Sequence, residues 1–183
     1  MKKYIILYLL ILLISGLFSQ SLPVRNYSTQ DGLPQNQVNY ITQDKEGYIW
    51  LRTLGGASKF DGYHFENFDL NSGIATNSLK SIGTNSSPLY FLGFSSVSLI
   101  EKNKNYNFDQ NYFKKVFKEE VVHVGSYSDS LADYIFVATP SKVFYLDFRT
   151  KTFKPYFDLS VLPEKVDTPT PLFSYPDLNR IFI

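Results

Sequence analysis

Few side chains in this sequence are of the types that carry out catalysis, and their spacing does not bring them together. The two histidines, His64 and His123, stand far apart and lack a nearby acidic cluster. A general acid or base needs a positioned partner, so we interpret both histidines as structural. The absence of cysteine excludes a thiolate metal site and a disulfide framework.

The acidic residues and the paired glycines also fit structural roles. Asp44, Asp61 and Asp147 stand at positions typical of turns, and Glu119-Glu120 is interpreted as a solvated pair of charges. Gly55-Gly56 is not followed by a predicted helix, so it lacks the context of a phosphate-binding loop. The sequence therefore predicts no catalytic, cofactor-binding or metal-binding residue, and no enzyme activity within this chain.

The elements that hold these residues are best seen between Gln43 and Gly62. Three turn signals, at 44–47, 55–56 and 61–62, separate short apolar runs of strand length. With the run 38–41 in front and the aromatic run 64–68 behind, this stretch predicts a meander of four antiparallel strands.

The same unit returns along the chain. Ile49-Trp50 aligns with Tyr90-Phe91, then with Ile135-Phe136 and Ile181-Phe182, at spacings of 41, 45 and 46 residues. A strand meander repeating every ~40–50 residues is typical of propeller blades. We therefore predict an all-β fold, an incomplete β-propeller of three four-stranded blades at 36–68, 77–108 and 119–156, with a fourth beginning at 172–183.

The predicted strands are 38–42, 48–53, 57–60 and 64–68 in the first blade, 79–83, 89–94, 97–101 and 106–108 in the second, and 121–125, 134–139, 143–148 and 153–156 in the third. Residues 24–28 are a candidate for a lone strand, of the kind that completes the last blade in ring folds. The segment 111–120 has apolar residues at helical spacing. It fits a short helix and an extended loop equally well.

The first repeat resembles a known family. The residues Asp44-x-x-Gly47-Tyr48-Ile49-Trp50-Leu51-x-Thr53-x-x-Gly56-x-x-x-Phe60-Asp61-Gly62 are similar to the two-component regulator propeller repeat, and 27–36 resembles the leader before it. The resemblance implies the periplasmic sensor region of a histidine kinase or hybrid two-component sensor. In such proteins a β-sandwich, a membrane helix and the kinase typically follow the propellers.

Two residues of this repeat call for separate interpretation. Trp50 could stack on a sugar ring, but its place in a central strand, and the phenylalanines that align with it, favour the core; those phenylalanines are Phe91, Phe136 and Phe182. Arg52 stands where the family usually has glycine, and it aligns with Gly93 and Ala138. We expect Arg52 to point to solvent or to pair with a carboxylate, and Arg52→Gly to be tolerated.

Successive strands of a blade run in opposite directions, so the loops that connect them alternate between two faces. Loops between blades and turns between second and third strands share one face, and the other turns share the opposite face. The first face collects 53–56, 69–76, 95–96, 109–120, 140–142 and 160–171, which are longer and richer in Asn, Tyr, Phe and Lys. Ligand contacts usually come from loops, so we expect a ligand, such as a glycan or other small molecule, on this face.

The charge balance argues against nucleic acid as a partner. The chain has 18 basic and 17 acidic residues, for a formal net charge of +1. A nucleic-acid-binding surface needs an excess of positive charge to contact phosphates.

The amino terminus has the order of residues found in secretory signal peptides. Lys2-Lys3 precedes an apolar run at 4–14, which Ser15-Gly16 ends. Cleavage after Ser19 is predicted, so residues 1–19 form the signal peptide and 20–183 the propeller domain. An uncleaved anchor is the alternative, but the run is shorter than the ~20 apolar residues that span a membrane. The predicted location is periplasmic or extracellular, and the parent protein could be anchored in the inner membrane.

The preferred function is therefore that of a non-catalytic, ligand-sensing or partner-binding propeller portion of a two-component sensor. A secreted propeller scaffold or secretion accessory is the alternative, and a periplasmic propeller hydrolase or lyase is less favoured. Propellers typically close with 4–8 blades, so we expect the open blade faces to meet further blades, a kinase-bearing region or another copy of the chain. A secreted fragment alone is expected to aggregate or to melt over a broad range.

Overall fold

The computed structural model describes residues 23–84, 88–102, 104–128 and 133–161, which form three antiparallel sheets of four strands each. Blade 1 contains β1 (Val38–Gln43), β2 (Ile49–Thr53), β3 (Gly56–Phe60) and β4 (Phe65–Phe68). Blade 2 contains β5 (Leu79–Gly83), β6 (Leu89–Gly93), β7 (Val97–Glu101) and β8 (Lys104–Phe108). Blade 3 contains β9 (His123–Ser128), β10 (Asp133–Ala138), β11 (Lys142–Asp147) and β12 (Thr152–Asp158).

These sheets confirm the three predicted blades and the strand order within each. Every sheet pairs its strands in sequence order, as a meander requires. Predicted strand 89–94 ends one residue early, because Phe94 lies in the turn that follows β6. The predicted signal peptide at 1–19 and the predicted fourth blade at 172–183 lie outside the described residues. None of the helices in the described part of the chain is long and apolar enough to cross a membrane.

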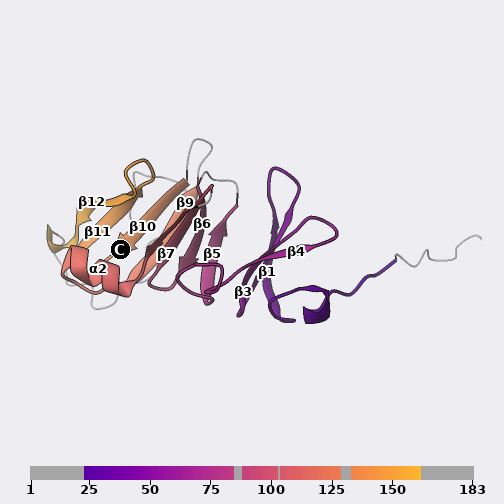
Figure 1. Ribbon diagram of the computed structural model, residues 1–183. Coiled ribbons are helices and arrows are strands. Elements are labelled where there is room, and N and C mark those ends of the chain that lie inside the picture. The colour runs from indigo at the N-terminus through magenta and orange to yellow at the C-terminus, as the bar shows by residue number, and fades with distance from the viewer. Residues whose placement is uncertain (1–22, 85–87, 103, 129–132, 162–183) are drawn as a thin grey trace, which may run out of the picture.

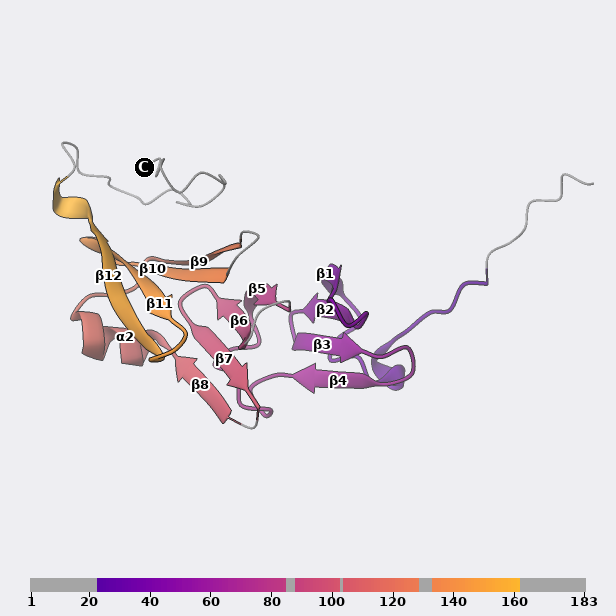
Figure 2. The ribbon, with the colours of Figure 1, turned by 90° about the horizontal axis from the view of Figure 1, so that it is seen from above.

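The three blades stand in a row and fan around a common side (Figures 1 and 2). Strands β1, β5 and β9 begin their blades and lie on the inner side, whereas β4 and β8 lie on the outer side (Figure 2). The short helices η1 (Thr29–Asp31) and α2 (Gln110–Phe117) both lie at the lower end in Figure 1. We call this end the linker face, because the segments joining successive blades run across it. We call the opposite end the turn face.

Each blade has a forward side, facing the next blade, and a backward side, facing the previous one. The forward side of blade 1 presents Trp50, Ala57 and Phe68, which pack against blade 2 residues Ile82 and Phe91. The next interface is built likewise, with forward-side residues of blade 2 packed on backward-side residues of blade 3; it includes Tyr90, Leu92, Val97, Leu99, Phe108, Val124, Ile135 and Val137. Burial on both sides explains why the strands do not alternate strictly between apolar and polar residues.

The strand pairing corrects the alignment of the middle repeat by one residue. Trp50 is paired with Lys59, and the residue paired with Leu99, forty positions after Lys59, is Tyr90 and not Phe91. Trp50 therefore corresponds to Tyr90, and the shortened segment of blade 2 lies between its first two strands. The same shift means that Arg52 corresponds to Leu92 and not to Gly93; its correspondence to Ala138 in blade 3 is unchanged.

The ambiguous segment between blades 2 and 3 is a helix. Asp109 caps α2 by accepting a hydrogen bond from the backbone N–H of Tyr112, and Lys118 ends it in a left-handed conformation. Phe113 is fully buried, and the ring of Phe117 stacks on Phe144 of β11 with centroids 4.0 Å apart. The helix thus fills the gap between blades 2 and 3 with aromatic rings.

The predicted lone strand at 24–28 is not a strand in the structure, since residues 23–28 have no strand partner among the described residues. Ser28 instead begins η1 with a capping box: its side chain accepts from the backbone of Gln30, and Asp31 accepts from the N–H of Ser28. Leu33, just beyond η1, is buried against blade 1.

Candidate ligand-binding face

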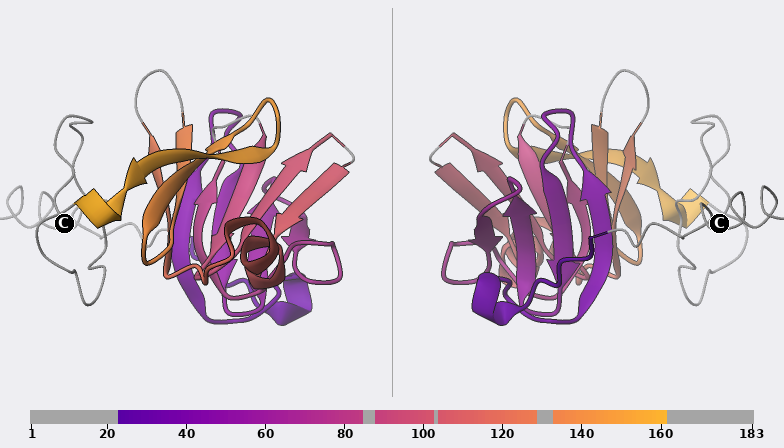
Figure 3. Two further views of the ribbon diagram at one scale, coloured as in Figure 1. Left: turned by 90° about the vertical axis from the view of Figure 1, so that its left-hand side faces the viewer. Right: turned by 90° about the vertical axis from the view of Figure 1, so that its right-hand side faces the viewer.

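The structure places the predicted ligand-facing loops together on the linker face. The linkers 69–76 and 109–120 and the turns 53–56, 95–96 and 140–142 all lie at this end of the blades (Figure 3). Of the predicted segment 160–171, only 160–161 belong to the described residues. Loops from all three blades therefore contribute to one surface.

Two of the turns on this face carry exposed apolar side chains. Leu54, between β2 and β3, is 58% exposed, and Phe94, between β6 and β7, is 69% exposed. The turn of blade 1 is fixed by Thr53, whose hydroxyl accepts from the N–H of Gly55 and donates to the carbonyl of Gly56. Gln35 also accepts a hydrogen bond from the N–H of Leu54 through its amide oxygen. These hydrogen bonds fix the backbone of the turn and leave the Leu54 side chain exposed to solvent.

Next to these turns, a row of polar and basic side chains crosses the inner strands from blade to blade. Arg52 of β2 donates through Nη1 to the carbonyl oxygen of Lys80 in β5, and its guanidinium lies 5.4 Å from the ring centre of Tyr40. The Lys80 ammonium donates to the carbonyl of Val124 in β9 at 3.1 Å and lies 3.3 Å from Nε2 of His123. We call Tyr40, Arg52, Lys80 and His123 the axial row.

The axial row is positively charged. Neither Arg52 nor Lys80 forms an ion pair among the described residues, where the ion pairs involve other side chains. The inner strands β1, β5 and β9 contain no Asp or Glu. Burial lowers the pKa of the Lys80 ammonium, and burial followed by the charge of Lys80 lowers the pKa of His123. An anionic group placed here would offset the cost of holding two unpaired cations in a half-buried place.

Arg52 does not pair with a carboxylate or point freely to solvent, so the expectation for this residue was wrong. It is half-buried and joins blade 1 to a backbone carbonyl of blade 2. Its long side chain reaches this carbonyl because it stands on the forward side at the end of β2. No sequence signal identified the partner, because Lys80 contributes its backbone and not its side chain.

Arg52→Gly is therefore expected to be destabilising and not tolerated. Hydrogen bonds to charged groups contribute about 1.5–3 kcal/mol, and the loss in free energy of unfolding should fall in that range. Arg52→Leu, which introduces the residue found at this position in blade 2, should cost less because it keeps apolar packing. Urea unfolding measures both variants. An unchanged midpoint for Arg52→Gly would contradict the inter-blade role.

The lowered pKa of His123 predicts a loss of stability on acidification. A histidine in the unfolded chain takes up a proton near pH 6.5, whereas folded His123 remains neutral to lower pH. The unfolded state then binds more protons, so this stabilisation is complete above about pH 7 and falls as the pH drops below about 6.5. The urea midpoint should fall more for the wild type than for His123→Gln between pH ~7.5 and ~5.5. Equal losses would refute the prediction.

The predicted turn aspartates do mark turns. Asp44 accepts from the N–H of Tyr48 at 2.8 Å, and its other oxygen accepts from Trp50 Nε1 at 2.7 Å. Asp61 accepts from the N–H groups of Tyr63 and His64, both at 2.7 Å, and the His64 bond is the leading cause of its lowered pKa. The hydrogen bond that the Trp50 side chain donates to Asp44 also links the turn to the core. The spacing of residues in the sequence did not predict this link.

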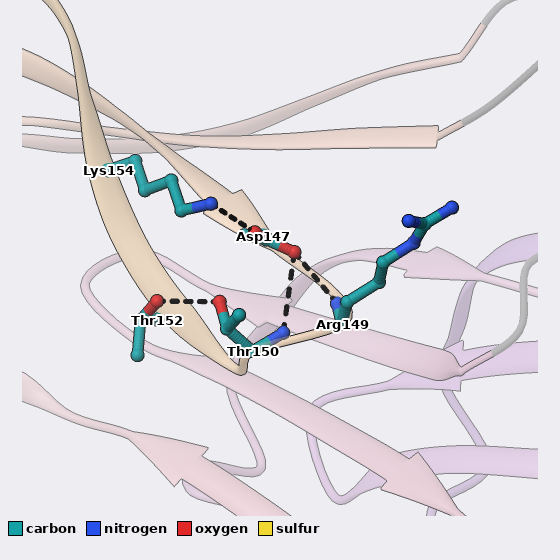
Figure 4. A network of polar contacts seen from close by, with 5 residues as sticks. All are labelled: Asp147, Arg149, Thr150, Thr152 and Lys154. Atoms are coloured by element: carbon teal, nitrogen blue, oxygen red, sulfur yellow. Dashed lines mark hydrogen bonds and ion pairs between the residues drawn. The ribbon is translucent and has the colours of Figure 1, made fainter.

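Asp147 makes the corresponding turn of blade 3 (Figure 4). Its carboxylate accepts from the N–H groups of Arg149 and Thr150 and forms an ion pair with Lys154, while Thr150 and Thr152 share a hydroxyl hydrogen bond. The Lys154 hydrogen bond is the leading cause of a strongly lowered pKa for Asp147. The partners of this carboxylate lie in the turn after β11 and in β12, at the end of the blade opposite the axial row, so the cluster closes a hairpin.

The two adjacent glutamates differ from each other. Glu120 pairs with Lys114 at 2.7 Å between largely exposed side chains, as expected of a solvated charge. Glu119 instead accepts from the hydroxyl of Ser141 at 2.6 Å, and this bond is the leading cause of its lowered pKa. Glu119 therefore ties the linker to the β10–β11 turn and is not a solvated charge. Within the described ranges no three His, Asp or Glu residues gather as a metal-binding group.

Trp50 is a core residue, as predicted. Its side chain is 3% exposed and packs with Phe68 and Phe91 at ring-centre distances of 5.3 and 6.2 Å. Phe91 faces it from the next blade and is not its equivalent, whereas Phe136 does occupy the equivalent place in blade 3. Phe182 lies outside the described residues.

Comparison with solved structures finds a similar fold in extracellular domains of bacterial two-component systems. The extracellular domain of BT3049 from B. thetaiotaomicron, assigned to a hybrid two-component system, superposes with a TM-score of 0.51 at 20% identity, over 73% of this chain and 18% of that one. The extracellular domain of BT4673 from the same organism, also assigned to a hybrid two-component system, gives a TM-score of 0.52 at 17% identity, over 75% and 19%. No family model matches the sequence, and no curated protein matches it significantly.

These likenesses confirm the fold as propeller blades, and they agree with the resemblance of the first repeat to the two-component regulator propeller family. The chain spans about a fifth of the length of the domains that it matches.

Proposed function

We propose that this chain forms part of the sensory region of an extracytoplasmic two-component sensor and binds a ligand on its linker face. The observation that carries the proposal is the axial row, in which Arg52 and Lys80 follow each other across the blades and have no carboxylate partner in the described part of the chain. The fold likeness to extracellular domains of two-component systems and the repeat motif support the sensory class. Any kinase activity would belong to another part of the protein.

The ligand that fits this surface combines an anionic group with an apolar or ring surface. Carboxylate, sulfate or phosphate oxygens suit the donors of Arg52 and Lys80. Tyr40, with 47% of its surface exposed, and Phe94 offer aromatic faces at the same end of the blades. An acidic oligosaccharide has both properties, because its rings can stack on aromatic side chains.

Signal output in the membrane-embedded protein tests the sensory role. The protein produced from its complete coding sequence should incorporate labelled phosphate from ATP, and an acidic oligosaccharide should change the rate where its neutral counterpart does not. The variant carrying Arg52→Met and Lys80→Met should lose the ligand effect while keeping basal labelling. Absence of any labelling would instead favour the scaffold alternative.

A further inference from the structure

A β-bulge places Lys80 at the centre of the axial row. The pairing of β5 with β6 shifts between Leu79 and Ser81, so Lys80 is an extra residue in the ladder. Bulges bend a strand and re-aim a side chain, and they are frequent next to functional sites. The carbonyl of Lys80 accepts from Arg52 of blade 1, while its ammonium reaches the inner strand of blade 3. One residue of blade 2 therefore links both neighbouring blades.

The Lys80 ammonium determines which nitrogen of His123 carries the proton. It lies 3.3 Å from Nε2, and an ammonium can only donate hydrogen bonds. Nε2 therefore accepts, and the neutral ring carries its proton on Nδ1. A proton added to Nε2 would place a second cation directly beside the ammonium. An anion between the two groups would remove this conflict, because its oxygens can accept a hydrogen bond from each.

The acidic residues on the elements around His123 are engaged elsewhere. In the linker before β9, Glu119 accepts from a serine of the β10–β11 turn, and Glu120 pairs with a lysine of α2. Asp133 begins the neighbouring strand β10 at the opposite end of the blade, where Ser128 donates to it. These carboxylates already have other partners, so an added anion is the group suited to meet a protonated His123.

The cations near this end of the blades act on His123 unequally. Arg52 comes from β2 and bonds to the carbonyl of Lys80, and Lys142 begins β11, two strands away from β9. Burial is the leading cause of the lowered pKa of His123, and the charge of Lys80 is the second. An anion that offsets the charge of Lys80 would therefore raise this pKa again.

We propose that the axial row takes up a proton on His123 when it takes up an anionic ligand, so that the acidic ligand binds more tightly as the pH falls. This inference rests on the proposed function and adds a dependence on acidity to the same surface. The coupling is reciprocal: if the proton strengthens anion binding by some factor, the anion strengthens proton binding by the same factor. The gain in affinity begins below the pKa of His123 in the complex and levels off below its lower pKa in the free protein.

Calorimetric titration of the mature protein, produced from its complete coding sequence, with a sulfated oligosaccharide tests this coupling. Sulfate esters stay ionised throughout the range in which histidine titrates, so the ligand itself takes up no proton. The affinity should rise at least about fivefold between pH ~7.5 and ~5.5, at the lower end of typical coupling factors. Titrations at pH ~6.5 in two buffers of different ionisation enthalpy should show net proton uptake on binding.

Two histidine variants locate the effect. His123→Gln, whose side chain cannot be protonated, should bind the sulfated oligosaccharide with the same affinity at both pH values. His64→Gln should keep the gain, because the His64 side chain is 87% exposed on the turn face, at the opposite end of the blades. Partial unfolding in acid would lower the measured affinity, so it cannot produce the expected rise.

The possible failures are distinguishable. Binding with constant affinity and no proton uptake would overturn the inference and leave the proposed function standing. A gain that persists in His123→Gln would also overturn it, by assigning the proton to another group. No binding of the sulfated oligosaccharide at either pH would contradict both the inference and the proposed function.

Discussion

Replacement of Trp50 by alanine is expected to lower the free energy of unfolding by about 3–5 kcal/mol, the range for large aromatic truncations in cores. Trp50 is buried between blades 1 and 2, where it contacts Phe68 and Phe91. The variant would open a cavity between two sheets that lose part of their shared core. Urea unfolding followed by circular dichroism measures the effect.

Two further variants separate packing from hydrogen bonding at this site. Trp50→Phe keeps an aromatic ring but removes the Nε1 donor to Asp44, so its loss should be smaller. Tyr63→Ala removes an aromatic side chain that is 81% exposed, and it should change stability by less than about 0.5 kcal/mol. Trp50→Ala with wild-type stability but impaired ligand binding would show that Trp50 is a ligand contact.

Gly56→Ala is the second change expected to have a large effect, with a loss of at least about 2 kcal/mol. Gly56 has a φ of 123°, and a Cβ atom there would come within 2.3 Å of the carbonyl oxygen of Phe68. That oxygen belongs to the backbone of the last residue of β4, which is paired with β3, so it cannot move aside as a flexible side chain would. The turn on the linker face would have to shift with it.

Gly62→Ala is the matched control for Gly56→Ala. Gly62 also has a positive φ, of 100°, but a Cβ atom there would meet nothing within 4 Å. Backbone strain alone should therefore act at Gly62, while strain and a close contact act together at Gly56. Thermal unfolding of both variants gives the comparison, and equal losses at the two positions would argue against the close contact.

Turn chemistry and repeat spacing predicted most of the fold. The turns at Asp44, Asp61 and Asp147 were correctly located because aspartate side chains accept backbone N–H groups wherever such turns form. The blade count and strand order followed from the repeat. The register of the middle copy did not follow, because Tyr90, Phe91 and Leu92 are all buried, on both sides of the sheet. Without alternation, a one-residue slip leaves the pattern unchanged.

The spacing of residues in the sequence could not predict the axial row, for a different reason. The polar partner of Arg52 is the carbonyl of Lys80, and Lys80 itself reaches the carbonyl of Val124. Backbone acceptors have no signature in the sequence, so only the packing of blades brings these groups together. By contrast, the likeness between the segment before blade 1 and the linker between blades 1 and 2 was visible in principle, since Gly32-Leu33 and Asn36 recur at Gly73-Ile74 and Asn77.

The most direct test of the proposed function is calorimetric binding of paired acidic and neutral oligosaccharides to the mature protein produced from its complete coding sequence. The double variant Arg52→Met and Lys80→Met should bind the acidic member at least about tenfold more weakly, a loss of about 1.4 kcal/mol. Lys104→Met, at an exposed position of the outer strand β8, should bind as the wild type does. Binding that weakens with salt and requires the acidic group is the predicted result. Equal affinity of the double variant and the wild type, or no preference for the acidic member, would contradict the account.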